Sequence, residues 1–158
     1  MSEKKKKLAI IAGHGTLDAA YPPLLLATTA AALDWEVGVF FTFYGLNLIN
    51  KKTYKKMKVG SVGNPAQPMP VPNIVGMLPG MTGMATMMMK RWMKKSNVAT
   101  YEELLEMAID ADVKLFGCQM TMDVFGMKRE DLIPEVTEVL GAAGFLDYAS
   151  DATVTLYI

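Results

Sequence analysis

The stretch LAIIAG at residues 8–13 constrains the fold most, because it is a continuous apolar run closed by glycine. Such a run is typical of a β-strand that is buried on both faces of a parallel sheet. An Ala- and Leu-rich segment follows at 16–34, and WEVGVFFTF at 35–43 has the aromatic and β-branched composition of a second strand. This order of elements predicts an α/β fold with three layers, in which a central, mostly parallel sheet of about five strands has helices on both faces.

The remaining segments continue the alternation. The first helix is expected to begin near Tyr21, because prolines such as those at 22 and 23 are tolerated in the first turn of a helix. Thr100 and Glu103 match a capping box, so another helix is expected to follow Thr100. The other predicted elements are short helices at 44–57 and 119–126, helices at 81–95 and 141–152, and strands at 114–118, 135–140 and 153–158.

A segment rich in proline and methionine interrupts this pattern. No charged residue occurs from Val59 to Met89, and we interpret 59–95 as an insertion within a single domain that spans 1–158. Prolines and glycines break every apolar span before it reaches 18 residues, so no transmembrane helix is expected. The segment contains a stripe of methionines and one tryptophan at helical spacing. Such a stripe most often packs in the core or against another subunit. Docking to a membrane or partner protein and binding of copper(I) are the less favoured alternatives. The stripe consists of Met81, Met84, Met88 and Trp92.

Composition excludes several classes of function. Lys and Arg total 16, as do Asp and Glu, so the formal net charge is zero and nucleic acid is not expected as a partner. A neutral, fairly apolar chain favours self-association. One cysteine and one histidine leave no intrachain disulfide and no metal cluster, and we expect no metal, flavin or nucleotide cofactor. The apolar run after the amino-terminal lysines is too short for a signal peptide, so we expect the protein in the cytoplasm.

The glycine-containing turn AGHGTLD at 12–18 lies where nucleotide-binding folds hold phosphate. Only two glycines fit that pattern, and Asp18 occupies the third position, where its carboxylate would repel phosphate. The segment therefore favours an ordinary tight turn that carries a surface histidine. His14 is kept as a supporting residue, since the carboxyl ends of parallel strands gather ligands.

Cys118 is the principal candidate for chemistry. It ends a predicted strand, and a helix is expected to begin immediately after it, so backbone N–H groups would favour the thiolate and lower the thiol pKa. Gly117 allows close backbone approach or an unusual turn, and Gln119 offers a side-chain donor. Free cysteine is also a common inert core residue, so these features leave a reactive, accessible thiol and a buried, unreactive one equally open.

The stretch LFGCQMTMDVFGM at 115–127, with GAAGFLDYASDATVTLYI at 141–158, resembles the DsrE/DsrF-like family of sulfur-trafficking proteins. The upstream stretch from Gly15 to Leu46 is similar to the first strand, helix and second strand of that family. The resemblance implies a compact α/β protein, assembled as a trimer or a multiple of it. It further implies a cysteine, here Cys118, that accepts sulfane sulfur as a persulfide or thiosulfonate. The sulfur would come from a low-molecular-weight donor or partner and pass onward, commonly to a small carrier of the TusA type.

Two other functions remain open. A non-catalytic oligomeric scaffold would use the methionine-rich helix to dock a membrane or a partner protein, and its Cys118 would be buried. A flavodoxin-like binder of flavin or nucleotide is disfavoured by the incomplete glycine turn. The absence of a second cysteine also means that an external thiol or partner must complete any sulfur transfer.

Overall fold

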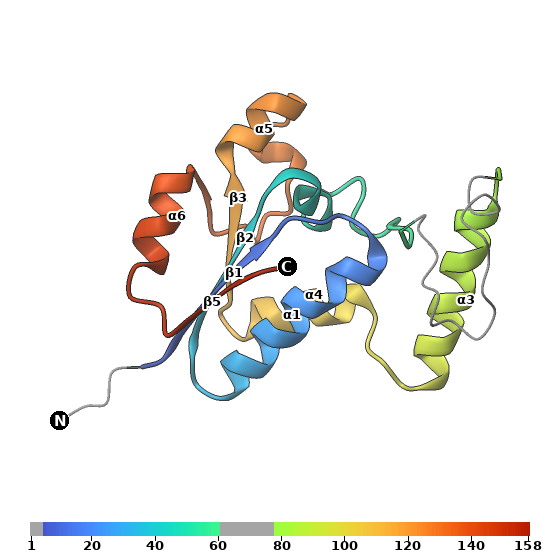
Figure 1. Ribbon diagram of the computed structural model, residues 1–158, viewed down its shortest axis with the longest axis horizontal. Coiled ribbons are helices and arrows are strands. Elements are labelled where there is room, and N and C mark those ends of the chain that lie inside the picture. Colours follow the sequence, from blue (N-terminus) through green and yellow to red (C-terminus); the bar gives the residue numbers. More distant parts are fainter. Residues whose placement is uncertain (1–4, 61–77) are drawn as a thin grey trace.

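The computed structural model describes residues 5–60 and 78–158 and has a parallel sheet at its centre (Figure 1). Within these residues the sheet has five strands in the order β4-β3-β2-β1-β5. Every neighbouring pair is parallel, which confirms the predicted α/β fold. The strands are β1 (Lys7–Ala12), β2 (Glu36–Phe41), β3 (Lys114–Cys118), β4 (Glu138–Leu140) and β5 (Val154–Tyr157).

Helices cover both faces of the sheet, as the sequence predicted. Helices α1 (Leu17–Ala32) and α4 (Tyr101–Asp110) lie side by side over one face, and α6 (Ala142–Ala149) covers the other (Figure 1). At the carboxyl edge of the sheet, η1 (Phe43–Leu48) follows β2 and α5 (Gln119–Phe125) follows β3. Helix α3 (Met81–Lys95) stands apart from the body, and the short turn η2 (Arg129–Asp131) precedes β4.

Alternating residues of the strands separate two apolar clusters. On the α1–α4 side, Ile10, Val39 and Leu115 are fully buried in the larger cluster. On the α6 side, Phe40 and Phe116 pack with Phe145 in a smaller one, and Phe40 stacks on Phe145 with ring centroids 4.6 Å apart. The smaller cluster also contains Cys118.

Helix α1 begins at Leu17, four residues earlier than the sequence predicted, so that Pro22 and Pro23 lie inside it. Neither proline has the N–H that would reach back one turn. Contacts from a distant loop stabilise the early turn instead, because the Leu17 N–H donates to the Lys58 carbonyl at 2.9 Å and the Gly60 N–H donates to the Asp18 carboxylate at 2.9 Å. These contacts are not local, which is why the sequence pattern did not reveal them.

The predicted short helix at 44–57 is instead the 3-10 turn η1 followed by irregular turns. Gly45 explains part of the difference, because a Cβ there would lie 2.0 Å from the Ala12 carbonyl oxygen. The segment is thus shaped by close approach to β1.

The capping box of α4 is confirmed, since the Glu103 N–H donates to Thr100 Oγ1 and the Thr100 N–H donates to Glu103.

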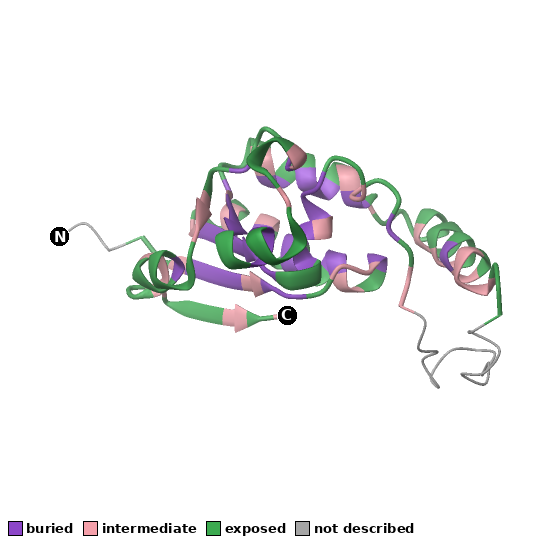
Figure 2. Cartoon of the chain, turned by 90° about the horizontal axis from the view of Figure 1, so that it is seen from above, coloured by how far each residue is buried: buried purple, intermediate pink, exposed green. Residues whose placement is uncertain are grey.

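The methionine stripe of α3 does not join the core of this chain. Met84, Met88 and Trp92 are 59%, 36% and 39% exposed, whereas Thr86 is buried and Met93 packs against the body. Figure 2 shows α3 as mostly exposed. Packing against another subunit stays a prediction, as does the single-domain division. Residues 61–77 of the predicted insertion lie outside the described part of the chain.

No helix within 5–60 and 78–158 is long and apolar enough to cross a membrane.

The last residue of the chain extends the β5 pairing with β1. The Ile158 N–H donates to the Ile11 carbonyl, and the Ile158 carbonyl accepts from the Gly13 N–H, both at 2.8 Å. This end of the chain therefore lies at the carboxyl edge of the sheet.

Candidate functional site

Cys118 is the last residue of β3 and the residue that precedes the first turn of α5, as predicted. Gly126 ends this helix in a left-handed conformation, also as predicted. Only 3% of Cys118 is exposed, so the structure shows the buried alternative and not the accessible thiol expected of a sulfur carrier. The side chain points to the α6 side, where Phe40, Phe116 and Phe145 surround it.

Two threonines lie beside the cysteine. The register of β2 on β3 pairs Phe41 with Gly117, so the next residues, Thr42 and Cys118, are neighbours on the same side of the sheet. Thr121 comes from the first turn of α5 and is fully buried. The two hydroxyl oxygens are 3.2 Å apart and hydrogen-bonded.

Opposing effects act on the pKa of the Cys118 thiol. Burial is the largest single influence and raises the pKa, because it penalises the charged form. The hydroxyls of Thr121 and Thr42 and the N–H groups of Thr121 and Met120 together outweigh burial and lower the pKa below its ordinary value. Cys118 makes no capping bond to α5 in the structure, and its two threonines bond to each other. These donors therefore act mainly on the thiolate, whose charge attracts them.

The backbone of Phe43 also bonds to the hydroxyl oxygen of Thr121. Phe43 has φ +47, which is unusual for a bulky residue, and its N–H donates to Thr121 Oγ1 at 3.1 Å. That oxygen keeps a second lone pair and its own proton, so it can donate to Thr42 Oγ1 or accept from it. Its hydroxyl also lowers the pKa of the Cys118 thiol.

Gly117 leaves room for close packing, and its backbone does not form an unusual turn. It lies in β3 without a left-handed backbone, and a Cβ there would be 3.2 Å from Leu132 Cδ1 and 3.7 Å from Met122 Sδ. Both neighbours are buried, so Gly117 lets α5 and the loop before β4 pack closely under the strand end.

Gln119 and His14 do not contact the sulfur. Gln119 is exposed, and its side-chain amide donates to the Asp123 carboxylate at 2.7 Å, so the predicted donor faces away from Cys118. His14 is exposed at the end of β1 and packs edge-on against Tyr157, with ring centroids 6.4 Å apart. Strand β2 lies between β1 and β3, so the fold does not bring His14 next to the cysteine.

The glycine turn after β1 is occupied by the protein itself. A Cβ at Gly15 would lie 2.2 Å from the Tyr44 carbonyl oxygen. The first N–H of α1, at Leu17, is already bonded to Lys58. Phosphate therefore has no free cradle here, which counts against the flavin or nucleotide interpretation. Among the residues that the structure describes, no group of three or more His, Cys, Asp or Glu side chains could hold a metal ion.

Exposed apolar side chains surround the buried cysteine at the carboxyl edge. We call them the apolar collar. Tyr44 and Phe125 stack with ring centroids 6.0 Å apart, which joins η1 to α5 across the site. Contiguous exposed apolar side chains are typical of surfaces that bind another molecule. The collar consists of Phe43, Tyr44, Met120, Val124 and Phe125, which are between 44% and 67% exposed.

The chain is thus an α/β protein that carries its single cysteine at the carboxyl end of an interior strand of a parallel sheet. The chain belongs to the DsrE/DsrF/DrsH-like family, whose model matches residues 4–157. This confirms the resemblance seen in the sequence.

Two curated relatives match over almost their full length. The chain is 50% identical over 161 residues to the sulfur carrier protein DsrE2 of Allochromatium vinosum, with 98% of this chain and 99% of the relative covered. It is 34% identical over 161 residues to the uncharacterized protein YrkE of Bacillus subtilis, with both chains covered completely.

Solved structures share the fold at low sequence identity. The ychN protein of E. coli superposes with a TM-score of 0.57 at 13% identity, covering 97% of this chain and 99% of that one. MTH1491 of Methanobacterium thermoautotrophicum, a protein of unknown function, gives 0.56 at 11% identity, covering 98% and 100%. These likenesses support the fold alone.

Proposed function

We propose that this protein is a sulfur carrier that holds sulfane sulfur as a persulfide on Cys118. The observation that carries the proposal is the set of donors around the sulfur. Two hydroxyls and two backbone N–H groups lower the pKa of a thiol whose burial alone would raise it. An inert core cysteine needs no such groups. The 50% identity to a protein named as a sulfur carrier supports the same role.

The transfer needs only nucleophilic displacement. The Cys118 thiolate attacks the outer sulfur of a donor persulfide, which forms the Cys118 S–S bond and breaks the S–S bond of the donor. The donor leaves as a thiolate and takes up a proton. An acceptor thiolate then attacks the outer sulfur on Cys118 and releases the Cys118 thiolate. No net oxidation occurs, and an intrachain disulfide has no part because the chain has one cysteine.

Burial of the sulfur makes access part of the function. Because Cys118 is 3% exposed, a donor would reach it only after the side chains that cover it move, and we propose that this movement separates η1 from α5 at the apolar collar. The collar would be the docking surface for a small carrier of the TusA type or another sulfur-donating protein, which would cover its apolar side chains. We further infer that the protein works in the cytoplasm and that its copies associate, with a trimer or a multiple of it as the expected state.

Mass spectrometry of the native chain tests the proposal. Incubation with polysulfide should add ~32 Da, the mass of one sulfur atom, and dithiothreitol should remove it. The Cys118→Ser variant should show no addition. Native wild-type protein that stays unmodified, while denatured protein reacts, would contradict a carrier role.

A second candidate function is favoured by the burial itself. If η1 and α5 do not open, Cys118 is a core residue and the protein is a non-catalytic oligomeric scaffold. In that case the native thiol resists labelling by maleimide as long as the fold is intact, and Cys118→Ser leaves partner binding unchanged.

A further inference from the structure

The basic residues of this neutral chain are segregated. Residues 37–101 contain nine of the 16 basic residues and none of the acidic ones. Four of the nine, Lys90, Arg91, Lys94 and Lys95, lie on α3 and are exposed. No ion pair within 4.0 Å involves these four cations among the described residues.

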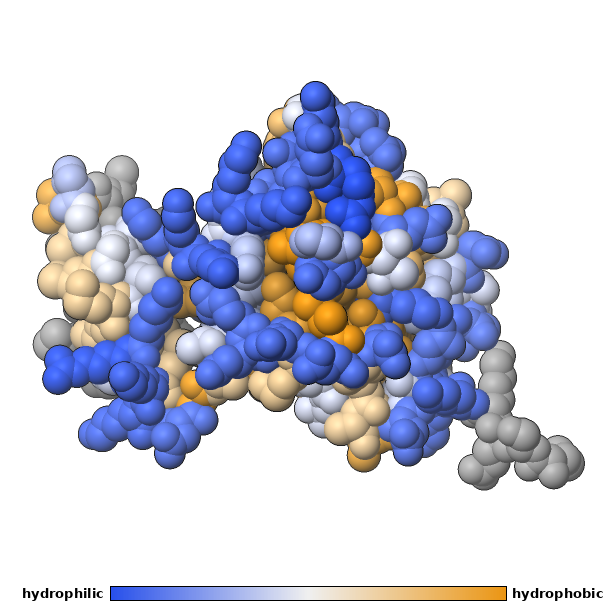
Figure 3. Space-filling model, turned by 180° about the vertical axis from the view of Figure 1, so that it is seen from behind, coloured by the Kyte–Doolittle hydropathy of each residue, from blue (hydrophilic) through white to orange (hydrophobic). Residues whose placement is uncertain are grey.

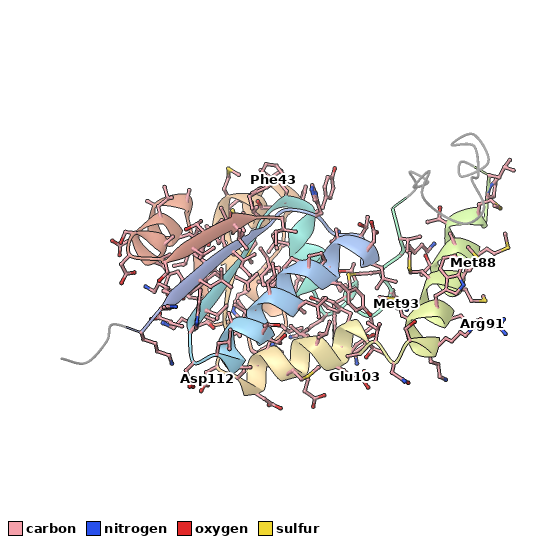
Figure 4. The ribbon with its side chains drawn as sticks, turned by 60° about the horizontal axis from the view of Figure 1, so that its bottom comes forward. Phe43, Met88, Arg91, Met93, Glu103 and Asp112 are labelled. Atoms are coloured by element: carbon pink, nitrogen blue, oxygen red, sulfur yellow. The ribbon has the colours of Figure 1, made fainter. Side chains whose placement is uncertain are left out.

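The outer side of α3 combines these charges with the methionine stripe. Met84 and Met88 are exposed on the same side as Arg91, given 100° of rotation per residue. Met93 points toward the body and Arg91 away from it in Figure 4. A cleft of about 730 Å³ separates the helix from the body, with Met57, Met93 and Val98 in its lining. Figure 3, seen from behind, shows the apolar side chains of this projecting segment beside hydrophilic ones.

The outer face of the α1–α4 layer has the opposite character. Residues 101–113 contain five acidic residues and no basic one. Glu106 and Asp110 are exposed there, and no ion pair in the described residues involves either of them. Exposed apolar residues accompany them, with Leu25 and Leu26 on α1 and Met107 on α4. Glu103 and Asp112 mark the two ends of this face in Figure 4.

We propose that the outer side of α3 in one copy of this chain packs against the outer α1–α4 face of a second copy. The cations of α3 then meet the carboxylates of α4, and the methionine stripe covers the exposed leucines and Met107. An anionic lipid surface would neutralise α3 but leave the acidic face uncovered, whereas a second copy satisfies both. The contact is head-to-tail, so it joins different surfaces, and the trimer proposed above requires that it close into a ring. This inference rests on the self-association proposed above and defines its interface.

Matched charge reversals of the full chain test the interface. One variant carries Arg91→Glu and Lys95→Glu, and the other carries Glu106→Lys and Asp110→Lys. Light scattering should give a multiple of 17.3 kDa for the wild type, and each reversal should raise the dissociation constant at least tenfold. Combining all four changes in one chain should restore association. Lys5→Glu with Lys128→Glu, at exposed positions outside both surfaces, is the charge-matched control and should behave as the wild type.

Each other outcome has a definite meaning. A wild-type chain that associates but is indifferent to both reversals overturns the interface and retains the association. So does a combined variant that stays dissociated while its circular dichroism shows a native fold. A wild-type chain that is monomeric and binds phosphatidylglycerol vesicles overturns both the interface and the association, and it assigns α3 to a membrane surface. Persulfide loading of Cys118, measured by mass on the same samples, tests the carrier role separately.

Discussion

The hydroxyl oxygens of Thr42 and Thr121 lie 3.2 Å apart beside Cys118, although 79 residues separate them in the sequence. Thr42 follows β2 as the N-cap of η1, and Thr121 lies in the first turn of α5, so the contact joins η1 to α5 beside Cys118. These hydroxyls bond to each other, and both also lower the pKa of the Cys118 thiol. The pair therefore links the protonation of Cys118 to the contact between η1 and α5.

The Thr121→Val variant should make Cys118 less acidic. Valine keeps the branched shape but removes a donor, and a hydrogen bond to a charged group contributes about 1.5–3 kcal/mol. The thiolate fraction near neutral pH should fall roughly tenfold or more, measured by the ultraviolet absorbance of the thiolate. Thr121→Ser keeps the hydroxyl and should stay close to the wild type. Equal losses in both variants would show that only packing matters.

The pKa of Cys118 should also make stability depend on pH. The donors around Cys118 lower its folded-state pKa below the ordinary value of a thiol, so the thiolate stabilises the native state. This contribution is fully present above the unfolded pKa and is lost as the pH falls through the folded pKa. In urea titrations, the wild type should gain stability relative to Cys118→Ser as the pH rises between the two values. A constant difference across that window would contradict the shift.

The Gly45→Ala variant should destabilise the fold. The added Cβ would lie 2.0 Å from the Ala12 carbonyl oxygen, and such overpacking costs about 1–3 kcal/mol or more. Gly83→Ala in α3 is the matched control, because no atom lies within 4 Å of its Cβ position. It should leave stability unchanged or raise it by up to about 1 kcal/mol. Urea denaturation compares the two, and similar midpoints would argue against the close approach of η1 to β1.

Arg129→Lys should loosen the loop before β4. The guanidinium donates to the carbonyls of Ile133 and Pro134 at 3.0 Å and of Val136 at 2.7 Å. A lysine ammonium lacks this fork and leaves carbonyls unpaired, at a cost of about 1–3 kcal/mol. Hydrogen exchange should show faster exchange for the Thr137 N–H, which donates to Leu115 on β3. Unchanged exchange and unchanged stability would show that the loop holds its conformation without Arg129.

Local patterns were sufficient to predict most elements of the fold. Apolar runs marked β1 and β3, a capping box marked α4, and the position of Cys118 between a strand and a helix followed from its neighbours. Thr121, three residues after Cys118, lies within one turn of the predicted helix, so its nearness was available from spacing. Thr42 was not, because only the register of β2 on β3 places it beside the sulfur.

The predictions that failed depended on distant contacts. The apolar side of α3 is a different case. Periodicity predicted that the core or another subunit covers it, and because Met84 is exposed in this chain, cover by another subunit stays a prediction. The early start of α1 depends on Lys58. The exposed side chain of Gln119 is an exception, because its bond to Asp123 lies within one turn of α5. Burial of Cys118 depends on its packing with Phe40 of β2 and Phe145 of α6, which no local pattern specifies.

The pairing of Ile158 with Ile11 and Gly13 has a practical consequence for anyone who prepares this protein. Any affinity tag fused after Ile158 emerges at the same edge of the sheet as Cys118, where it would compete with sulfur donors and with whatever binds the collar. A tag placed before Lys7 emerges at the opposite edge, where β1 begins (Figure 1). Reactivity and association should therefore be measured on amino-terminally tagged or tag-free protein.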